Sequence, residues 1–381
     1  MVLGFACLPW VSDPANAEPS GCNQPASRAI TQIDVPGRPF SAVPSADGCS
    51  IFVSLTGRNG RSQVAVLARS NGEMSLLRTV AAPGQLTGMA LSGDGKVLVA
   101  ATGQGIVLLS TERLVTGAEN ALLDGPAGGA GAGHIYVAFT PDDKRVFVSA
   151  ERSDTLSVYD FTEGSTGSVM HLAGQIRTGG APVGLVLSPD GRWLYSTSEV
   201  GPGERSCAPE GKGPVHPAGM LMVIDVARSA VDPASAVVAR VPAGCNPVRV
   251  AVSPTGDRVY VTARGSHAVI VFDASKLVSD PDHSQQASVP VGPSPVGIAV
   301  DGAHVFVANS DRFGAGRNAS ISFLDVNHLD VAAGRIPAGG FPRELKLTRD
   351  GRSLLVTNFG SGSVELIDLE RLAELRGITM K

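Results

Sequence analysis

The chain is poor in charge and in long apolar runs. Only 17% of its 381 residues are Asp, Glu, Lys or Arg, and the formal net charge is −4. A nucleic-acid partner is therefore not expected, because phosphate backbones are bound through clustered basic residues. No run approaches the ~18 consecutive apolar residues that a membrane span needs. We therefore expect no membrane span.

Residues suited to holding a cofactor or a metal are also scarce. Two Trp and four Tyr provide few rings for stacking a cofactor, and the seven His show no H-x-x-x-H spacing. The glycine-rich stretch "GGAGAGH" precedes a strand pattern, whereas a phosphate-binding loop precedes a helix. No cofactor and no dedicated metal site are expected from these patterns.

Cysteines are few, but their placement favours export. The first residues combine a short apolar run with an Ala15-Asn16-Ala17 cleavage pattern, so residues 1–17 are expected to be a signal peptide. Its basic segment is missing, which indicates a truncated leader; the alternative is a disordered N-terminus of a cytosolic protein. A periplasmic or secreted location permits disulfides. Four cysteines then remain, with three possible pairings: Cys22, Cys49, Cys207 and Cys245.

Repetition is the feature that the chain has in abundance. Copies such as "NPVRVAVSPTGDRVYVTARGSHAVIVFDASKL" share an x-Pro start, a short apolar strand, an Asp-Gly-type turn and two further strands. A fourth strand follows and ends in a short Pro/Gly tag such as "ASVPVG". Seven copies of such a four-stranded repeat predict an all-β, seven-bladed β-propeller with four-stranded antiparallel blades, a single domain over residues 18–381. We call the residue two places after the Pro the pore position. It falls at Ser41, Gly88, Tyr136, Gly184, Arg249, Gly297 and Glu344.

The two ends of the chain are expected to meet in the last blade. Blade seven shows three clear strands, while the segment "AITQIDVPG" before blade one matches the fourth-strand pattern of other repeats. An N-terminal strand that completes blade seven would remove two exposed sheet edges. Repeats four and six carry insertions between their second and third strands. We call the face with these insertions the top face, because insertions on one face often mark a binding surface.

The same strand order selects one disulfide pairing. Cys207 lies in the insertion of blade four and Cys245 at the start of blade five, both on the top face. Cys22 precedes the closing strand and Cys49 lies in the first turn of blade one, both on the bottom face. Only the pairing Cys22–Cys49 with Cys207–Cys245 joins cysteines of the same face.

Three pore positions break the preference for small residues. Tyr136, Arg249 and Glu344 stand where other repeats have Gly or Ser. His134 occupies the Pro place of blade three, Arg343 precedes Glu344, and Lys346 lies one step deeper in the channel. Opposite charges in a narrow channel pair and shift their pKa values, as at functional sites. The alternative is a solvated pore that tolerates any polar residue.

A second group of polar residues is expected on the top face, where the second strands end. It consists of Glu151, Glu199, Arg264, Asn309 and Asn358, with His267 close by. The alternative is ordinary loop charge, and the two asparagines suit turns. The Asp that ends the third strand in most repeats is instead expected to be a structural turn acceptor. It recurs as Asp160, Asp225, Asp273, Asp325 and Asp368.

The repeats resemble the YVTN family of bacterial seven-bladed propellers, through "VRVAVSPTGDRVYVTA", "VGLVLSPDGRWLYSTS" and "LKLTRDGRSLLVTN". Within that superfamily, the segment "FPREL" is similar to the P-R-x-[FL] pattern of lactonase-type propellers, which include 6-phosphogluconolactonase and carboxymuconate cyclase. Those enzymes use a His, an Arg and a Glu on the top face. The resemblance implies these parts for His134, Arg249 and Glu344.

Two functions remain open at this stage. The first is a lactonase-like hydrolase or cyclase, in which Arg249 and Arg343 hold an anionic lactone, His134 acts as base and Glu344 orients the reactants. Further substrate contacts would come from Tyr136, Lys346, Glu151, Glu199, Arg264, Asn309 and Asn358. The second is a non-catalytic exported propeller whose top loops bind a protein, a glycan or an envelope partner. A monomer is expected in either case.

Overall fold

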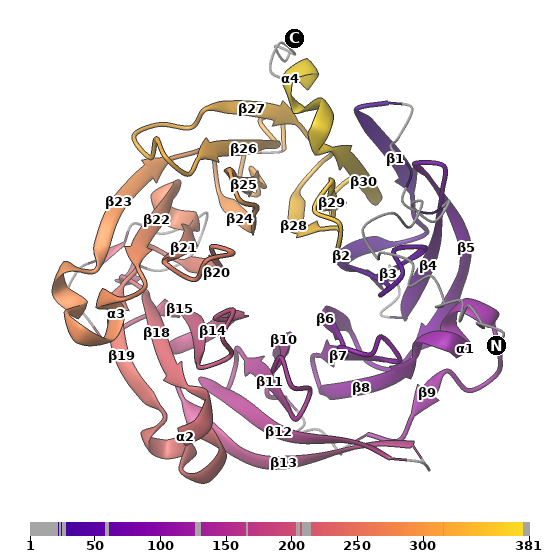
Figure 1. Cartoon of the computed structure of the whole chain (residues 1–381), viewed down its shortest axis with the longest axis horizontal. Helices are drawn as coiled ribbons and strands as arrows, with labels where there is room; N and C mark the ends of the chain where they lie inside the picture. Colours follow the sequence, from indigo (N-terminus) through magenta and orange to yellow (C-terminus); the bar gives the residue numbers. More distant parts are fainter. Residues whose placement is uncertain are drawn as a thin grey trace, which may run out of the picture.

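The computed structural model describes residues 22, 24, 28–57, 61–125, 131–164, 167–202, 206–207, 215–314 and 316–375. The expected signal peptide, residues 1–17, lies outside this part of the chain. Seven four-stranded antiparallel sheets stand around a central channel, as the sequence repeat predicts. The first strand of each blade lies innermost and the fourth outermost (Figure 1).

The first three blades follow one another without insertions. Blade one consists of β2 (Arg38–Pro44), β3 (Ser50–Thr56), β4 (Ser62–Ser70) and β5 (Glu73–Ala82). Blade two consists of β6 (Leu86–Leu91), β7 (Val97–Thr102), β8 (Gly105–Ser110) and β9 (Leu122–Leu123). Blade three consists of β10 (His134–Phe139), β11 (Arg145–Ala150), β12 (Thr155–Gly164) and β13 (Gly167–Arg177).

Blades four to six contain the two insertions. Blade four consists of β14 (Gly180–Leu187), β15 (Trp193–Val200), β18 (Met220–Asp225) and β19 (Val237–Pro242). Its insertion forms a small hairpin of β16 (Ser206–Cys207) and β17 (His216–Pro217). Blade five consists of β20 (Pro247–Val252), β21 (Arg258–Ala263), β22 (Ala268–Asp273) and β23 (Gln285–Pro290). Blade six consists of β24 (Pro295–Val300), β25 (His304–Asn309), β26 (Ser320–Asp325) and β27 (Gly334–Pro337).

Blade seven joins the two ends of the chain, which confirms the predicted closure. It consists of β28 (Pro342–Leu347), β29 (Ser353–Asn358), β30 (Ser363–Asp368) and the N-terminal β1 (Ile30–Asp34). β1 pairs antiparallel with β30, so that Ile30 lies opposite Ile367 and Asp34 opposite Ser363. Val35, directly after β1, is buried against apolar residues of blades one and seven.

The helices are short, and all but one of those described lie after the third strand of their blade; the exception lies between the second and third strands of blade five. Their bounds are α1 (Thr111–Thr116), α2 (Val226–Val231), η3 (Pro233–Ser235), η4 (Arg264–Ser266), α3 (Lys276–Ser279), η5 (Pro281–His283), η6 (Leu369–Arg371) and α4 (Leu372–Leu375). Asp225 accepts a hydrogen bond from Arg228 N and Asp368 one from Glu370 N. These carboxylates therefore cap the chain after the strand, as a repeated structural acceptor does. No helix within the described ranges is long and apolar enough to cross a membrane.

Hydroxyl groups join neighbouring blades around the channel. At the pore positions of blades one, three, four, five and seven, the backbone N–H donates to a Ser or Thr hydroxyl on the second strand. Each of these hydroxyls donates in turn to a carbonyl of the next blade's inner strand. Thr357 thus binds Phe40 O at 3.2 Å and links blade seven to blade one. The ring is closed by this contact at its centre as well as by β1 at its rim.

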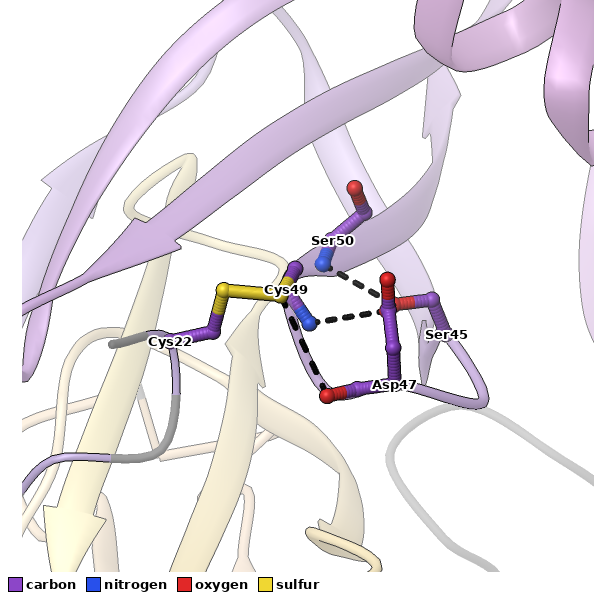
Figure 2. The surroundings of a disulfide bond; sticks show 5 residues. All are labelled: Cys22, Ser45, Asp47, Cys49 and Ser50. Atoms are coloured by element: carbon purple, nitrogen blue, oxygen red, sulfur yellow. Dashed lines mark hydrogen bonds between the residues drawn. A yellow bond between two sulfur atoms is a disulfide. The ribbon is translucent and has the colours of Figure 1, made fainter. Parts of the chain in front are cut away.

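Both predicted disulfides are present. Cys22 bonds Cys49 and Cys207 bonds Cys245, with Cα–Cα distances of 4.8 and 5.6 Å. Figure 2 shows Cys49 at the β2–β3 turn, where its N–H donates to Asp47 Oδ1 at 3.0 Å. In the same turn Ser50 N donates to Ser45 Oγ at 2.9 Å. Cys22, from the segment that precedes β1, is thereby attached to an ordered turn of blade one.

Removing the first disulfide is expected to destabilise the protein by about 2–4 kcal/mol. The Cys22→Ser/Cys49→Ser variant releases the segment before β1 from blade one, and the free energy of unfolding in urea measures the loss. Peptide mapping without reduction provides the control, because it must recover the Cys22–Cys49 and Cys207–Cys245 peptides from the wild-type protein. An unchanged unfolding midpoint would show that this bond contributes nothing to ring closure.

Candidate functional site

Small and large residues alternate at the pore positions of blades two to seven. A Cβ on Gly88 would lie 2.8 Å from the Tyr136 ring, and a Cβ on Gly184 would lie 2.9 Å from Arg249 Cα. A Cβ on Gly297 would similarly lie 3.1 Å from Glu344 Cα. The glycines of blades two, four and six thus let the inner strands approach closely. The large polar side chains of blades three, five and seven can therefore occupy the space at the centre.

These three polar side chains form one layer across the channel. The Tyr136 hydroxyl donates to Glu344 Oε1 at 2.5 Å, and the Arg249 guanidinium lies 4.5 Å from the centroid of the Tyr136 ring. Burial, and next the charge of Glu344, raise the pKa of Tyr136, so its hydroxyl stays protonated and donates. Glu344 and Arg249 are both buried. The sequence-predicted pore residues are thus in direct contact.

Several polar atoms of this layer lack a protein partner. Glu344 Oε2 and the Arg249 Nε and Nη2 atoms are buried with no hydrogen-bond partner among the described residues. Arg249 Nη1 donates to the adjacent carbonyl of Val248, at 3.4 Å. Buried polar groups are normally paired, because leaving them unpaired costs free energy. The layer therefore retains donors and an acceptor for water or a ligand.

Arg343 lies beside this layer on an aromatic surface. Its Cζ atom is 3.9 Å from the Phe40 ring centroid, 5.3 Å from Phe359 and 5.7 Å from Phe341. Burial lowers the pKa of Arg343, and the charges of Arg249 and Arg312 lower it further. The guanidinium stays positive at neutral pH because its ordinary pKa is so high. Arg343 is thus a half-buried cation among other cations.

Phe341 adopts a backbone conformation that is unusual for an aromatic residue. Its φ is 51°, and the equivalent residues before the Pro of blades four, five and six, Ala181, Asn246 and Ser294, also have φ near 50°. A bulky residue in this left-handed region is rare. Phe341 contacts the Phe359 ring edge-on at 5.4 Å and lies 5.9 Å from Arg312 Cζ. The conformation thus recurs in several blades, and in blade seven it places an aromatic ring near the Cζ atoms of Arg312 and Arg343, at 5.9 and 5.7 Å.

Of the polar residues predicted where the second strands end, only some lie close together. Arg264 forms a bidentate salt bridge with Glu199, at 3.1 and 3.2 Å, and both side chains are largely buried. Burial, and next the charge of Glu199, raise the pKa of Glu151, while Arg343 and Arg264 oppose that rise. Blades three, four, five and seven therefore contribute to one group of interacting charges on the top face.

His134 is buried at the start of β10. Its Nδ1 atom has no hydrogen-bond partner among the described residues, and burial lowers its pKa below the ordinary value. The residue is therefore neutral at pH 7 and has a free ring nitrogen, which a general base requires. His134 lies opposite Ala150 in the β10–β11 ladder. Glu151 is the next residue in the chain after Ala150.

Four other predicted residues lie apart from this group. Asn309 donates to Ser320 Oγ and Ser322 Oγ inside blade six, and Asn358 donates to Ser363 Oγ inside blade seven. Both asparagines are fully buried within their blades. His267 accepts a hydrogen bond from Ser294 N through Nδ1 at 3.1 Å. Lys346 lines the channel farther along β28 and is exposed.

Sequence reasoning missed Arg312 and the aromatic residues around Arg343. Arg312 belongs to the blade six insertion "SDRFGAGRNAS", which the repeat analysis had already placed on the top face. The basic residues of that insertion were the available signal. The aromatic contacts have no such signal, because they join Phe40 of blade one to Phe341 and Phe359, which flank the first two strands of blade seven. Within the described residues, no three His, Cys, Asp or Glu side chains group as a metal ion would need.

The close approach of the inner strands at the pore-position glycines predicts that a side chain there lowers stability. An alanine at Gly184 would place its Cβ 2.7 Å from Val248 O and 2.9 Å from Arg249 Cα, both backbone atoms of the next blade. We expect Gly184→Ala to destabilise the ring by about 1–3 kcal/mol, as overpacking does. Gly302→Ala is the control, because a Cβ there meets no atom within 4 Å. The free energy of unfolding in urea, measured for both variants, tests whether the inner strands are this close. Equal values for Gly184→Ala and Gly302→Ala would contradict it.

Comparisons with known proteins agree with this architecture. The family described as "Lactonase, 7-bladed beta-propeller" matches residues 53–311 and 230–376 of the chain. No curated protein matches the sequence significantly. Among solved structures, a functionally unknown protein from Desulfotomaculum acetoxidans DSM 771 superposes with a TM-score of 0.60 at 12% identity. The match covers 80% of this chain and 86% of that one, and at such low identity it supports the fold alone.

Proposed function

Because the chain belongs to the lactonase family of seven-bladed β-propellers, we propose that its top face binds and hydrolyses a small anionic lactone at the centre of the ring. We also propose that the protein is exported to the periplasm or outside the cell, which suits its two disulfides. The proposed substrate is an anion that contains a lactone ring.

The observation that supports it best is the gathering of arginines. Arg249, Arg312 and Arg264 all lower the pKa of Arg343, which means that four guanidinium groups act on one region. Glu199 neutralises Arg264, and Glu344 and Glu151 offset part of the remaining charge. Like charges in a buried site are unfavourable unless an anion joins them. A carboxylate or phosphate of the substrate would supply that anion through bidentate contacts.

The reaction would be an ordinary ester hydrolysis. His134, neutral and with no partner for Nδ1 in the described part of the chain, would take a proton from water while the water oxygen attacks the lactone carbonyl. The ring C–O bond then breaks and the departing oxygen receives the proton, giving a hydroxy acid. Arg249 and Arg343 would hold the anionic group of the substrate. Glu344, fixed by Tyr136 through Oε1, would orient water or substrate through its free Oε2.

A panel of lactones in a pH-stat tests this function. Lactones that carry a carboxylate or phosphate should be hydrolysed faster than their neutral esters, because only the former neutralise the arginines. Arg343→Met should erase that preference mainly through KM, while Arg113→Met, a change on the outer helix α1, should keep it. Equal rates for charged and neutral lactones, or no hydrolysis above background, would contradict the proposal.

A second function, non-catalytic binding, is favoured by one observation. Glu344 and Arg249 are already engaged with Tyr136, so the layer could simply close the channel. The top face would then recognise a protein, glycan or envelope partner, with the blade four insertion held to blade five by Cys207–Cys245. Two results together would support this function. A partner would be recovered from the periplasm with the wild-type protein but not with a variant that lacks this disulfide, and no lactone hydrolysis would be detected.

A further inference from the structure

The channel below the Tyr136 layer differs chemically from the top face. It contains a cavity of about 500 Å³ bounded by the inner strands β2, β6, β10, β14, β20, β24 and β28. This volume falls in the range of small-molecule sites, about 300–1,000 Å³. Tyr136 lines the cavity, whereas Arg249 and Glu344 do not. The polar layer therefore separates this lower cavity from the candidate site above it.

Small apolar residues form a ring around this lower cavity. Since alternate residues of a strand share a face, the second residue after each pore position also faces the channel. All seven of these residues line the cavity. They are Val43, Ala90, Ala138, Val186, Ala251, Ala299 and Lys346. Six of the seven are Val or Ala, so the ring offers an apolar wall with a single charged member.

Lys346 is an unpaired cation in this apolar ring. It is exposed and forms no salt bridge with any residue in the described part of the chain. Arg349, in the β28–β29 turn, also lines the cavity and donates to Gly93 O at 3.5 Å. The nearby turn acids Asp94 and Asp350 are engaged locally, by Ser92 and Thr348 hydroxyls at 2.7 and 2.6 Å. The cavity thus combines an apolar wall with two cations from blade seven.

We propose that the lower cavity is a second ligand site, for an apolar monocarboxylate. The hydrocarbon would lie against the Ala and Val ring below Tyr136, and the carboxylate would remain near the bottom opening with Lys346 and Arg349. A lysine suits this arrangement, because its flexible stem packs on apolar surface while its ammonium stays in water. The inner strand continues for three residues beyond the pore position, about 10 Å at the usual rise. This site is independent of the lactonase proposal.

Octanoate is a suitable probe, used with the full-length protein in isothermal titration calorimetry. We expect it to bind at least about tenfold more tightly than 1-octanol, which lacks the charge, or propanoate, which lacks the chain. Lys346→Met keeps the length of the side chain but removes its charge, and should weaken octanoate binding by about tenfold or more. Lys144→Met is the matched control, because Lys144 is an exposed lysine in the β10–β11 turn. It should leave the affinity unchanged.

Two further variants separate the lower cavity from the top face. Ala299→Leu fills part of the ring and should weaken octanoate binding although both cations remain; its melting temperature confirms that it is folded. Arg249→Ala should leave octanoate binding intact. Loss of binding in Arg249→Ala would place the probe at the top site and overturn the proposal. Equal affinity of Lys346→Met and wild type, or equal affinity for octanoate and 1-octanol, would overturn it as well.

Discussion

We expect His134→Ala to reduce lactone turnover by about 10²–10⁴-fold, the usual range for loss of a general base. The reason is specific to this histidine: it is buried, neutral, and has a ring nitrogen with no hydrogen-bond partner among the described residues. The effect should fall on kcat, because His134 carries no charge with which to hold the anionic substrate. Steady-state kinetics on the best lactone of the panel measure this.

Two comparisons make that result diagnostic. Arg249→Ala should weaken substrate binding by roughly 2–4 kcal/mol, the cost of a lost buried charge contact, and should therefore raise KM. The pH profile supplies the second comparison. Because burial lowers the pKa of His134 below the ordinary histidine value of about 6.5, the acid limb of kcat/KM should lie below that pH and vanish in His134→Ala. An acid limb that persists in the variant would assign the base to another group.

Deleting residues 28–36, which contain β1, is expected to produce aggregation. The deletion exposes the edge of β30, with which β1 pairs along its whole length, and exposed strand edges pair with other chains. It also removes Ile33 and Val35 from the apolar cluster between blades one and seven. Losing these two side chains should cost about 3–5 kcal/mol. Light scattering and the melting temperature report the two effects.

The control for this deletion changes β1 without removing it. Gln32 is an exposed residue of β1 opposite Glu365, so Gln32→Ala should remain monomeric with an unchanged melting temperature. If the deletion variant itself stays monomeric and melts at the wild-type temperature, β1 does not close the ring. The edge of β30 would then have to be protected by another segment.

The sequence was sufficient to predict the blades, the closure and the disulfides. Each depends on a pattern that recurs at a fixed interval, and strand order assigns Cys22 and Cys49 to one face and Cys207 and Cys245 to the other. The hydroxyl contacts between blades were not foreseen. They depend on one Ser or Thr in the second strand of five of the blades, such as Thr197, whose role becomes visible only when Val248 O of the next blade is placed beside it.

The residues of the candidate site could be predicted where they differ from the residue that the repeat usually has at that position. Tyr136, Arg249 and Glu344 stood out because glycine was the expected residue, and they do meet at the centre of the ring. Lys346 was predicted one step deeper in the channel, and it lines the lower cavity, below the layer. Arg312 was missed because its position depends on the fold of an insertion that has no counterpart in most other repeats.

A crystal structure with a small dicarboxylate soaked into the protein would test the central claim most directly. The claim is that the arginines on the top face form a site for an organic anion. It predicts a carboxylate bound to Arg249 and Arg343 above the Tyr136–Glu344 pair, with Lys346 uninvolved. A top face that contains only water at saturating dicarboxylate, with the anion bound elsewhere or not at all, would contradict it.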